Sequence, residues 1–337
     1  MTPDTDPSVS VLLPFVNEGS WLKEAMDSIL KQSFHDFEII LIDNGADSVT
    51  REIACSYAMA DHRVQLLEER NKGIAHALNA GIRVARGKYI ARMDADDIAL
   101  PDRIQRQVEL LESEDSLGVV ASKTEVFPAT AENEGFIRFV NWQNSIVTPE
   151  EHALSRFIES PVAHPSVMMR KKLFDFYGHY ATDPVPEDYE LWLRWMKQGV
   201  CFRKHECVLL RWRDHPDRLS RSHDHYAEAA FLRTKASYLF HWTQQHCDGR
   251  PIVVCGSSRT IRQKIRVLET AGIRIEAVTD VKEHPSNDRP FLTVSELKDR
   301  KDIFVINLIA RSDLRDPIRN FLSSAGKTEG EDFILAG

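Results

Sequence analysis

The feature that most constrains this chain is a regular alternation of short apolar segments with longer amphipathic ones over residues 8–93. The apolar segments have the length of buried strands, and the amphipathic ones have helical periodicity. Strand-like and helical segments alternate at residues 8–13, 21–32, 37–42, 48–60, 64–67, 74–85 and 89–93. This order predicts an α/β fold with a mainly parallel sheet covered by helices on both faces. Ligands of such sheets bind beyond the carboxyl ends of the strands.

Polar or turn residues follow three of the predicted strands, at 14–18, 43–45 and 94–97. The last of these segments holds three carboxylates, Asp94, Asp96 and Asp97. Neighbouring carboxylates repel one another and resist burial, so they favour a hard divalent cation that binds phosphate oxygens. A solvated acidic turn before a helix at 102–112 is the alternative, and the carboxylates alone leave both interpretations open.

Charge, hydropathy and cysteine content exclude several classes of protein. The net charge is −8 and the acidic excess lies in residues 1–249, which argues against a nucleic-acid-binding face. No apolar run approaches the roughly 20 residues that span a bilayer. Residues 1–7 lack the basic start and apolar region of a signal peptide, so we expect a cytoplasmic protein. The five cysteines include no Cys-x-x-Cys pair, which argues against disulfides and zinc.

Eight segments of the chain resemble glycosyltransferase family 2, and they come in the order typical of that family. The segments are SVLLPFVNE (10–18), AMDSILKQS (25–33), FEIILID (37–43), NKGIA (71–75), NAGI (79–82), GKYI (87–90), DADD (94–97) and EDYELWLR (187–194). The resemblance covers about residues 8–220. It implies a GT-A nucleotide-sugar-binding fold, a nucleotide-sugar donor, a divalent metal (Mn²⁺ or Mg²⁺) held at a DXD motif, and inversion at the anomeric carbon.

The same resemblance implies a set of site residues. Asp188 is the expected general base, with Glu187 as its support, and the metal ligands are Asp96, Asp94 and His215. The residues expected to bind the nucleotide sugar are Pro14, Phe15, Asn17, Glu18, Asp43, Asn44, Lys72, Gly73, Asp94, Ala95 and Arg213.

Each of these assignments has a structural alternative. A Glu-Asp pair at a helix start also caps the helix, and Asp43 to Gly45 reads as an ordinary turn. Asn44 stands where many family members have a second aspartate, so the identity of the base stays open, although an amide can donate to and accept from a base edge. His215 lies in a polar turn, where a histidine is commonly just exposed.

Residues 123–165 break the alternation and contain several aromatic residues in a polar context. We expect a long irregular insertion there, which either lines the acceptor side or makes a surface excursion.

A second domain is expected at residues 250–337, after a catalytic domain at 1–222 and a helical linker at 223–249. Strand-like and helical segments alternate again in this region, which predicts a small Rossmann-like α/β domain. Its first turn, Cys255 to Thr260, keeps one of the three glycines that let a backbone approach a pyrophosphate, which argues against dinucleotide binding. Packing, oligomerisation or docking to an assembly partner are the expected roles.

The residues and the resemblance together predict a metal-dependent inverting glycosyltransferase of the hexosyltransferase type. We expect it to move a sugar from a nucleotide donor, with a UDP-sugar favoured, to a hydroxyl of a glycan or lipid-linked acceptor in surface polysaccharide or lipopolysaccharide synthesis. A lipid-linked acceptor implies peripheral association with the inner face of a membrane. The alternative is a catalytically inactive nucleotide-sugar-binding regulatory protein. Dehydrogenases and nucleotidyltransferases need a glycine-rich loop after the first strand, and residues 14–18 do not form one.

Overall fold

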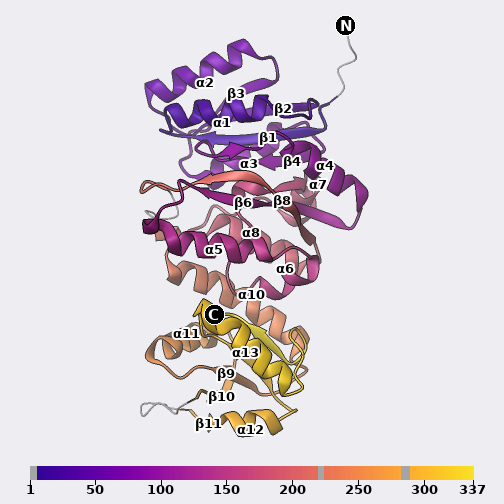
Figure 1. Cartoon of the computed structure of the whole chain (residues 1–337), viewed down its shortest axis with the longest axis vertical. Coiled ribbons are helices and arrows are strands. Elements are labelled where there is room, and N and C mark those ends of the chain that lie inside the picture. Colours follow the sequence, from indigo (N-terminus) through magenta and orange to yellow (C-terminus); the bar gives the residue numbers. More distant parts are fainter. Residues whose placement is uncertain (1–5, 219–223, 282–288) are drawn as a thin grey trace. The chain divides into compact units, whose positions relative to one another are not determined.

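The computed structural model describes residues 6–218, 224–281 and 289–337, which fold as two units, each with its own sheet (Figure 1). The first unit comprises Met1–Pro149, Val162–Asp183 and Glu190–Ser222, and the second comprises Glu150–Pro161, Pro184–Tyr189 and His223–Gly337. Two short segments from the middle of the chain therefore belong to the C-terminal unit. One of them carries the acidic pair Glu187 and Asp188.

The sheet of the first unit has eight strands in the order β3-β2-β1-β4-β7-β6-β8-β5. The strands are β1 (Val9–Phe15), β2 (Phe37–Asp43), β3 (Val64–Glu68), β4 (Tyr89–Arg92), β5 (Ile98–Ala99), β6 (Leu117–Phe127), β7 (Met168–Arg170) and β8 (Cys201–Arg213). Strands β3, β2, β1 and β4 are parallel to one another, and β6 is parallel to β8. Strand β7 is antiparallel to β4 and β6, and β5 is antiparallel to β8. The prediction of an α/β fold with a mainly parallel sheet is confirmed.

Helices cover both faces of the parallel strands. The helical segments up to residue 197 are α1 (Ser20–Leu30), α2 (Ser48–Ala60), α3 (Ile74–Val84), α4 (Arg103–Ser113), η1 (Ala131–Asn133), α5 (Glu134–Ser145), α6 (Pro149–Ser155), η2 (His164–Ser166), α7 (Lys172–Tyr177) and α8 (Glu187–Lys197). Leu13 and Leu41 belong to the core cluster that includes α1 and α4, and Leu12 and Ile40 to the cluster that includes α3. Because successive strand residues face opposite sides, strands covered on both faces are apolar throughout.

The strand register brings the carboxyl ends of β1, β2 and β3 to one edge of the sheet. Phe15 lies beside Asp43, and Asp43 lies beside Glu68. Strand β4 ends at Arg92, which pairs with Leu12 of β1. The polar segments that follow these strands in the sequence therefore emerge along the same edge, where ligands of parallel sheets bind.

The expectation of an irregular insertion at residues 123–165 is wrong. Strand β6 continues to Phe127 beside β8, and α5 follows from Glu134 to Ser145. The side chain of Asn144 pairs with the backbone of Thr124, accepting from its N–H at 2.9 Å and donating to its carbonyl at 2.8 Å. The buried residues of α5 are Val140 and Gln143. Because the buried face of α5 is narrow and half polar, the sequence of this segment shows no clear helical periodicity.

The second unit is built on a five-stranded parallel sheet in the order β11-β10-β9-β12-β13. Its strands are β9 (Ile252–Cys255), β10 (Ile275–Thr279), β11 (Phe291–Leu292), β12 (Phe304–Asn307) and β13 (Phe333–Leu335). Its helical segments from residue 224 on are η3 (Asp224–Tyr226), α10 (Glu228–His246), α11 (Arg259–Thr270), α12 (Val294–Asp299) and α13 (Ser312–Ser324). A doubly wound order of this kind is Rossmann-like.

The turn after β9 is closed by apolar side chains. Gly256 has a φ of +111°, and a Cβ placed there would lie 2.9 Å from Ile261 Cγ1 and 3.2 Å from Ile309 Cγ1. The carboxylate of Asp280 at the end of β10 accepts the backbone N–H and the hydroxyl of Ser257, both at 2.9 Å. That these residues bind no dinucleotide stays a prediction.

A buried lysine holds parts of the second unit together. The ammonium of Lys235 in α10 donates to the carbonyl of Ile158 at 2.9 Å and to that of Ala336 at 3.0 Å. Burial and the nearby charge of Lys264 lower the pKa of Lys235 to about 7, against the opposing effect of Glu159. The folded unit therefore loses this proton far more readily than the unfolded chain does.

We predict that Lys235→Met removes a pH dependence of stability. Between about pH 7 and 10 the unfolded chain binds a proton that the folded unit lacks, so the free energy of unfolding rises with pH by at most about 1.4 kcal/mol per pH unit. Urea unfolding measured across this range should show the rise in the wild type and in Lys301→Met, which alters an exposed lysine. An unchanged slope in Lys235→Met would contradict the assignment.

Candidate active site

Three carboxylates gather in the turn after β4. Carboxylate oxygens of Asp94, Asp96 and Asp97 all lie within 4.8 Å of one another. The turn is closed by a backbone hydrogen bond from the N–H of Asp97 to the carbonyl of Asp94 at 3.4 Å. Directly after it, Ile98 pairs with Arg211 of β8. Strand β8 thus holds the acidic turn from a distant part of the sequence.

A basic side chain or a backbone donor contacts each of the three carboxylates. Arg92, at the end of β4, forms an ion pair with Asp94. The backbone N–H of Arg213 donates to Asp97 Oδ1 at 2.8 Å, and its Nε donates to the carbonyl of Asp96 at 2.6 Å. His215 Nε2 lies 2.8 Å from Asp96 Oδ2. The turn is therefore fixed in place by cations and backbone donors rather than solvated.

These contacts do not balance the negative charge. Asp97 is fully buried, and its burial together with the charges of Asp96 and Asp94 raises its pKa well above the usual range. Burial also raises the pKa of Glu18 to about 7, with Asp96 and Asp94 adding to the shift. Burial and mutual repulsion both disfavour the charged forms of these carboxyl groups, so a cation bound among them would be stabilising.

A divalent cation fits this donor set. Asp97 Oδ2 is buried and has no hydrogen-bond partner among the residues that the structure describes, and the same holds for His215 Nδ1. Carboxylate oxygens are the preferred ligands of Mg²⁺, and Mn²⁺ accepts both carboxylate and imidazole. The structure brings two of the three predicted metal ligands, Asp94 and Asp96, into one cluster. The third, His215, contacts this cluster through Asp96.

Aromatic rings hold His215 and Arg213, two of the residues that contact the carboxylates. The ring centroid of Trp21 lies 4.6 Å from that of His215. The guanidinium of Arg213 lies 5.3 Å from the centroid of Trp21 and 4.5 Å from that of Phe127. Stacking on two rings restricts a long side chain, so Arg213 is held at the acidic turn with little freedom.

The residues at the end of β1 make local contacts. Pro14 and Phe15 are the last two residues of the strand, and the Phe15 side chain belongs to the apolar core. Glu18 accepts the backbone N–H of Val16 at 2.7 Å, and Asn17 accepts that of Asp47 at 2.9 Å. The Phe15 side chain therefore packs in the core beneath the loop that follows β1, and it has no polar group to offer a ligand.

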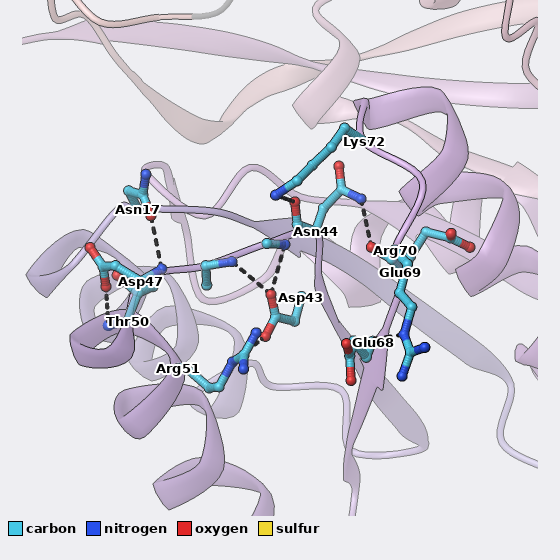
Figure 2. A network of polar contacts seen from close by, with 12 residues as sticks. Asn17, Asp43, Asn44, Asp47, Thr50, Arg51, Glu68, Glu69, Arg70 and Lys72 are labelled. Atoms are coloured by element: carbon cyan, nitrogen blue, oxygen red, sulfur yellow. Dashed lines mark hydrogen bonds and ion pairs between the residues drawn. The ribbon is translucent and has the colours of Figure 1, made fainter.

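The turn after β2 is a closed hydrogen-bond network, shown in Figure 2. Asp43 Oδ1 accepts the backbone N–H groups of Gly45 and Ala46 at 2.9 and 2.8 Å, and its Oδ2 accepts Arg51 Nε at 2.7 Å. These contacts lower the pKa of Asp43 although burial opposes them. Asp43 is therefore an ionised, almost fully buried anchor of the turn.

The side chain of Asn44 is occupied by backbone groups. Its amide donates to the carbonyls of Glu69 and Asn71 at 2.9 and 2.8 Å, and its oxygen accepts the N–H of Gly73 at 2.8 Å. Lys72 Nζ donates to the Asn44 carbonyl at 3.2 Å. In this arrangement Asn44 shapes the segment that carries Lys72 and Gly73, and its amide is not presented to a nucleobase.

The acidic pair of the second unit lies in the first turn of α8. Glu187 is almost fully buried, and its Oε2 accepts the hydroxyl of Tyr226 at 2.7 Å. The next residue, Asp188, is partly exposed, and its Oδ1 accepts the backbone N–H of Tyr189 at 2.7 Å. The two neighbouring carboxylates thus have different surroundings, one held inside the unit and one at its surface.

Comparisons with known proteins identify the family. The model of glycosyl transferase family 2 matches residues 10–178. A glycosyltransferase of Methanocaldococcus jannaschii is 31% identical over 218 residues, which are 61% of this chain and 71% of that protein. The EpsE glycosyltransferase of Bacillus subtilis is 32% identical over 201 residues, or 58% and 69% of the two chains. The chain belongs to glycosyltransferase family 2.

Solved structures of glycosyltransferases share the fold. Residues 1–349 of TarS from S. aureus, in complex with UDP-GlcNAc, match with a TM-score of 0.58 at 14% identity, over 78% of this chain and 71% of that one. The mannosyltransferase PcManGT of Pyrobaculum calidifontis, in complex with GDP-Man and Mn²⁺, matches with a TM-score of 0.50 at 18% identity, over 80% and 74% of the chains. This family 2 glycosyltransferase therefore has the GT-A-like fold.

Sequence reasoning missed several residues that hold the site of this glycosyltransferase. Arg92 could have been found, because a charged residue inside an apolar strand directly before an acidic cluster suggests an ion pair. Trp21 and Tyr226 carried no such signal, since each meets its partner through contacts between distant segments. Ala95, which was expected to contact the donor, has its side chain in the core.

We predict that Asp97→Asn stabilises the glycosyltransferase when divalent ions are removed. The folded-state pKa of Asp97 is raised, so its charged form costs stability at pH 7, and a neutral amide removes that cost. The melting temperature in EDTA should rise by about 2–4 °C per kcal/mol gained, and the gain should shrink as the pH falls through the native pKa. Asp115→Asn, at an exposed aspartate, should show no rise. A lower melting temperature for Asp97→Asn would contradict this account.

Proposed function

We propose that this glycosyltransferase moves a hexose, with inversion, from a nucleoside-diphosphate donor to an acceptor hydroxyl. The observation that carries the proposal is the partly buried carboxylate cluster after β4, in which the buried Asp97 Oδ2 has no partner in the described residues. A nucleoside diphosphate is a good leaving group only when its charge is neutralised. An ion-binding cluster at the ligand-binding edge of the sheet serves that purpose.

The proposed cofactor is Mn²⁺ or Mg²⁺, held by Asp96 and Asp94 with His215. When bound, the ion supplies positive charge next to the diphosphate. Arg213 adds a fixed cation to the same place, because two aromatic rings and the carbonyl of Asp96 hold its guanidinium. Structural neighbours solved with UDP-GlcNAc, and with GDP-Man and Mn²⁺, support a donor and an ion of this kind.

The nucleoside is proposed to bind at the ends of β1 to β3, beside Asn17, Glu18 and Lys72. Donor groups at this edge come from the ammonium of Lys72, which folds over Gly45, and from the half-exposed guanidinium of Arg51 (Figure 2). A UDP-sugar stays the favoured donor. Because the Asn44 amide is used by the backbone, we assign the choice of base to other groups of this edge.

Asp188 is the proposed general base, since inversion in a single step needs a carboxylate to take the proton of the attacking hydroxyl. Its place in the first turn of α8 favours the ionised form, because the helix dipole is positive at that end. Glu187 is the proposed support. The presence of both acidic motifs argues against an inactive regulatory protein that only binds nucleotide sugars.

The proposed acceptor is a glycan or a lipid-linked glycan of surface polysaccharide or lipopolysaccharide synthesis. No helix among the described residues is long and apolar enough to cross a bilayer. Peripheral contact with a membrane that carries the acceptor, and docking of an assembly partner or a second copy through residues 250–337, are parts of the same proposal.

We predict that Asp96→Ala abolishes ion-dependent donor binding. UDP and GDP, each added with and without Mn²⁺, should raise the melting temperature of the wild type by mass action, and the Mn²⁺-dependent part should vanish in the variant. Asp102→Ala, at an exposed aspartate beyond the cluster, is the matched control and should keep it. Wild-type affinity for a nucleoside diphosphate in Asp96→Ala would overturn the metal assignment.

We predict that Asp188→Asn lowers turnover by roughly 10² to 10⁴-fold, or about 3–5 kcal/mol of barrier. The amide keeps the shape of the side chain and removes its basicity, so affinity for the donor should hardly change. Release of nucleoside diphosphate from UDP-GlcNAc and GDP-Man measures turnover, with Asp183→Asn, at an exposed aspartate, as control. If Asp188→Asn stayed active while Glu187→Gln did not, the base would be Glu187.

A further inference from the structure

Glu187, the first residue of the acidic pair, is held by a short segment that follows it by almost forty positions in the chain. The hydroxyl of Tyr226 in η3 donates to Glu187 Oε2 at 2.7 Å. Both residues belong to the second unit, and Glu187 is only 5% exposed. A hydrogen bond to a carboxylate in such a place is charge-assisted and stronger than one between neutral groups.

The same segment also holds the residue on the other side of Asp188. Tyr189 is completely buried, its ring centroid lies 5.5 Å from that of Phe231 in α10, and its hydroxyl donates to the carbonyl of Arg156 at 2.7 Å. Residues 226–231 therefore contact the neighbours of Asp188 on both sides. The backbone at Asp188 has little freedom to shift.

We propose that Tyr226 is a positioning residue for catalysis, which acts through Glu187 to fix the first turn of α8 and with it the carboxylate of Asp188. This inference rests on the proposed function of Asp188. Glutamate has three side-chain torsions, and fixing them costs entropy that the Tyr226 hydroxyl offsets. Glu187 is held inside the unit, and Asp188 is the partly exposed carboxylate of the pair. A misplacement of about 1 Å at such a group is enough to slow a reaction severely.

The test uses Tyr226→Phe, which removes the hydroxyl and keeps the ring. Release of nucleoside diphosphate from UDP-GlcNAc and GDP-Man with Mn²⁺ should show kcat lower by roughly tenfold and the donor KM unchanged within twofold, because the donor is bound by other residues. In a Glu187→Ala background the same change should have no further effect, since its partner is gone. Tyr57→Phe is the matched control, because it removes a tyrosine hydroxyl that donates to a carboxylate, Asp27, at 2.5 Å in the other unit.

A second readout needs no substrate. In protein labelled with ¹³C-glutamate, the carboxyl signal of Glu187 is the one that Glu187→Ala removes. Loss of the donated hydrogen bond destabilises the ionised form, so Tyr226→Phe should raise the midpoint of this signal's titration and Tyr57→Phe should leave it unchanged.

Three kinetic results would overturn the inference: wild-type kcat in Tyr226→Phe, an equal loss of kcat in Tyr57→Phe, or the same additional loss in the Glu187→Ala background. An unchanged carboxyl midpoint in Tyr226→Phe would also overturn it. Failure of the proposed function looks different. In that case the wild type releases no nucleoside diphosphate, or Asp188→Asn is as active as the wild type, and a catalytic role for Tyr226 falls with it while the titration still reports the contact.

Discussion

The repulsion among the three carboxylates after β4 is the electrostatic cost that the surrounding residues of the first unit have to offset. Bringing Asp94, Asp96 and Asp97 together costs free energy, which the fold offsets with buried cations. Arg92 pairs with Asp94, and behind it the buried Arg103 donates to the Arg92 carbonyl at 2.6 Å. Burial lowers the pKa of Arg103 to about 9, against the charge of Asp97. The pKa of Asp97 is raised despite these cations, so the repulsion is only partly offset, and the proposed divalent ion would supply further positive charge.

Strand β8 connects the carboxylate cluster to the aromatic ring of Phe127. It pairs with β5 directly behind the acidic turn, and Arg213 at its end donates to Asp97 and Asp96. The guanidinium of Arg211 lies 4.4 Å from the Phe127 ring that also stacks on Arg213. Positive groups are thus fixed in the absence of a ligand, so little reorganisation would be needed if charge develops on the proposed diphosphate.

The sequence predicted those parts of the molecule whose pattern is local. The alternation over residues 8–93 gave β1 to β4 with α1 to α3, because strands buried on both faces must be apolar. It could not give α5, whose buried stripe is half polar, nor the pairing of β6 with β8 across a long separation. The acidic turn was found through its composition. The role of Asn44 was not, because only the folded chain shows that backbone groups use its amide.

The second unit is more than an appended domain. At Gly256, where dinucleotide-binding folds leave the backbone open, Ile261 and Ile309 fill the space, and the Asp280 carboxylate is used by Ser257. These contacts agree with the prediction that this turn binds no dinucleotide. What this unit does contain is the start of α8 with Glu187 and Asp188, together with Tyr226, which holds Glu187. Glu187 and Tyr189, on either side of Asp188, both contact residues that follow position 223. The C-terminal unit therefore supports the proposed catalytic base through its neighbours, and a chain that ends before this position would lose that support.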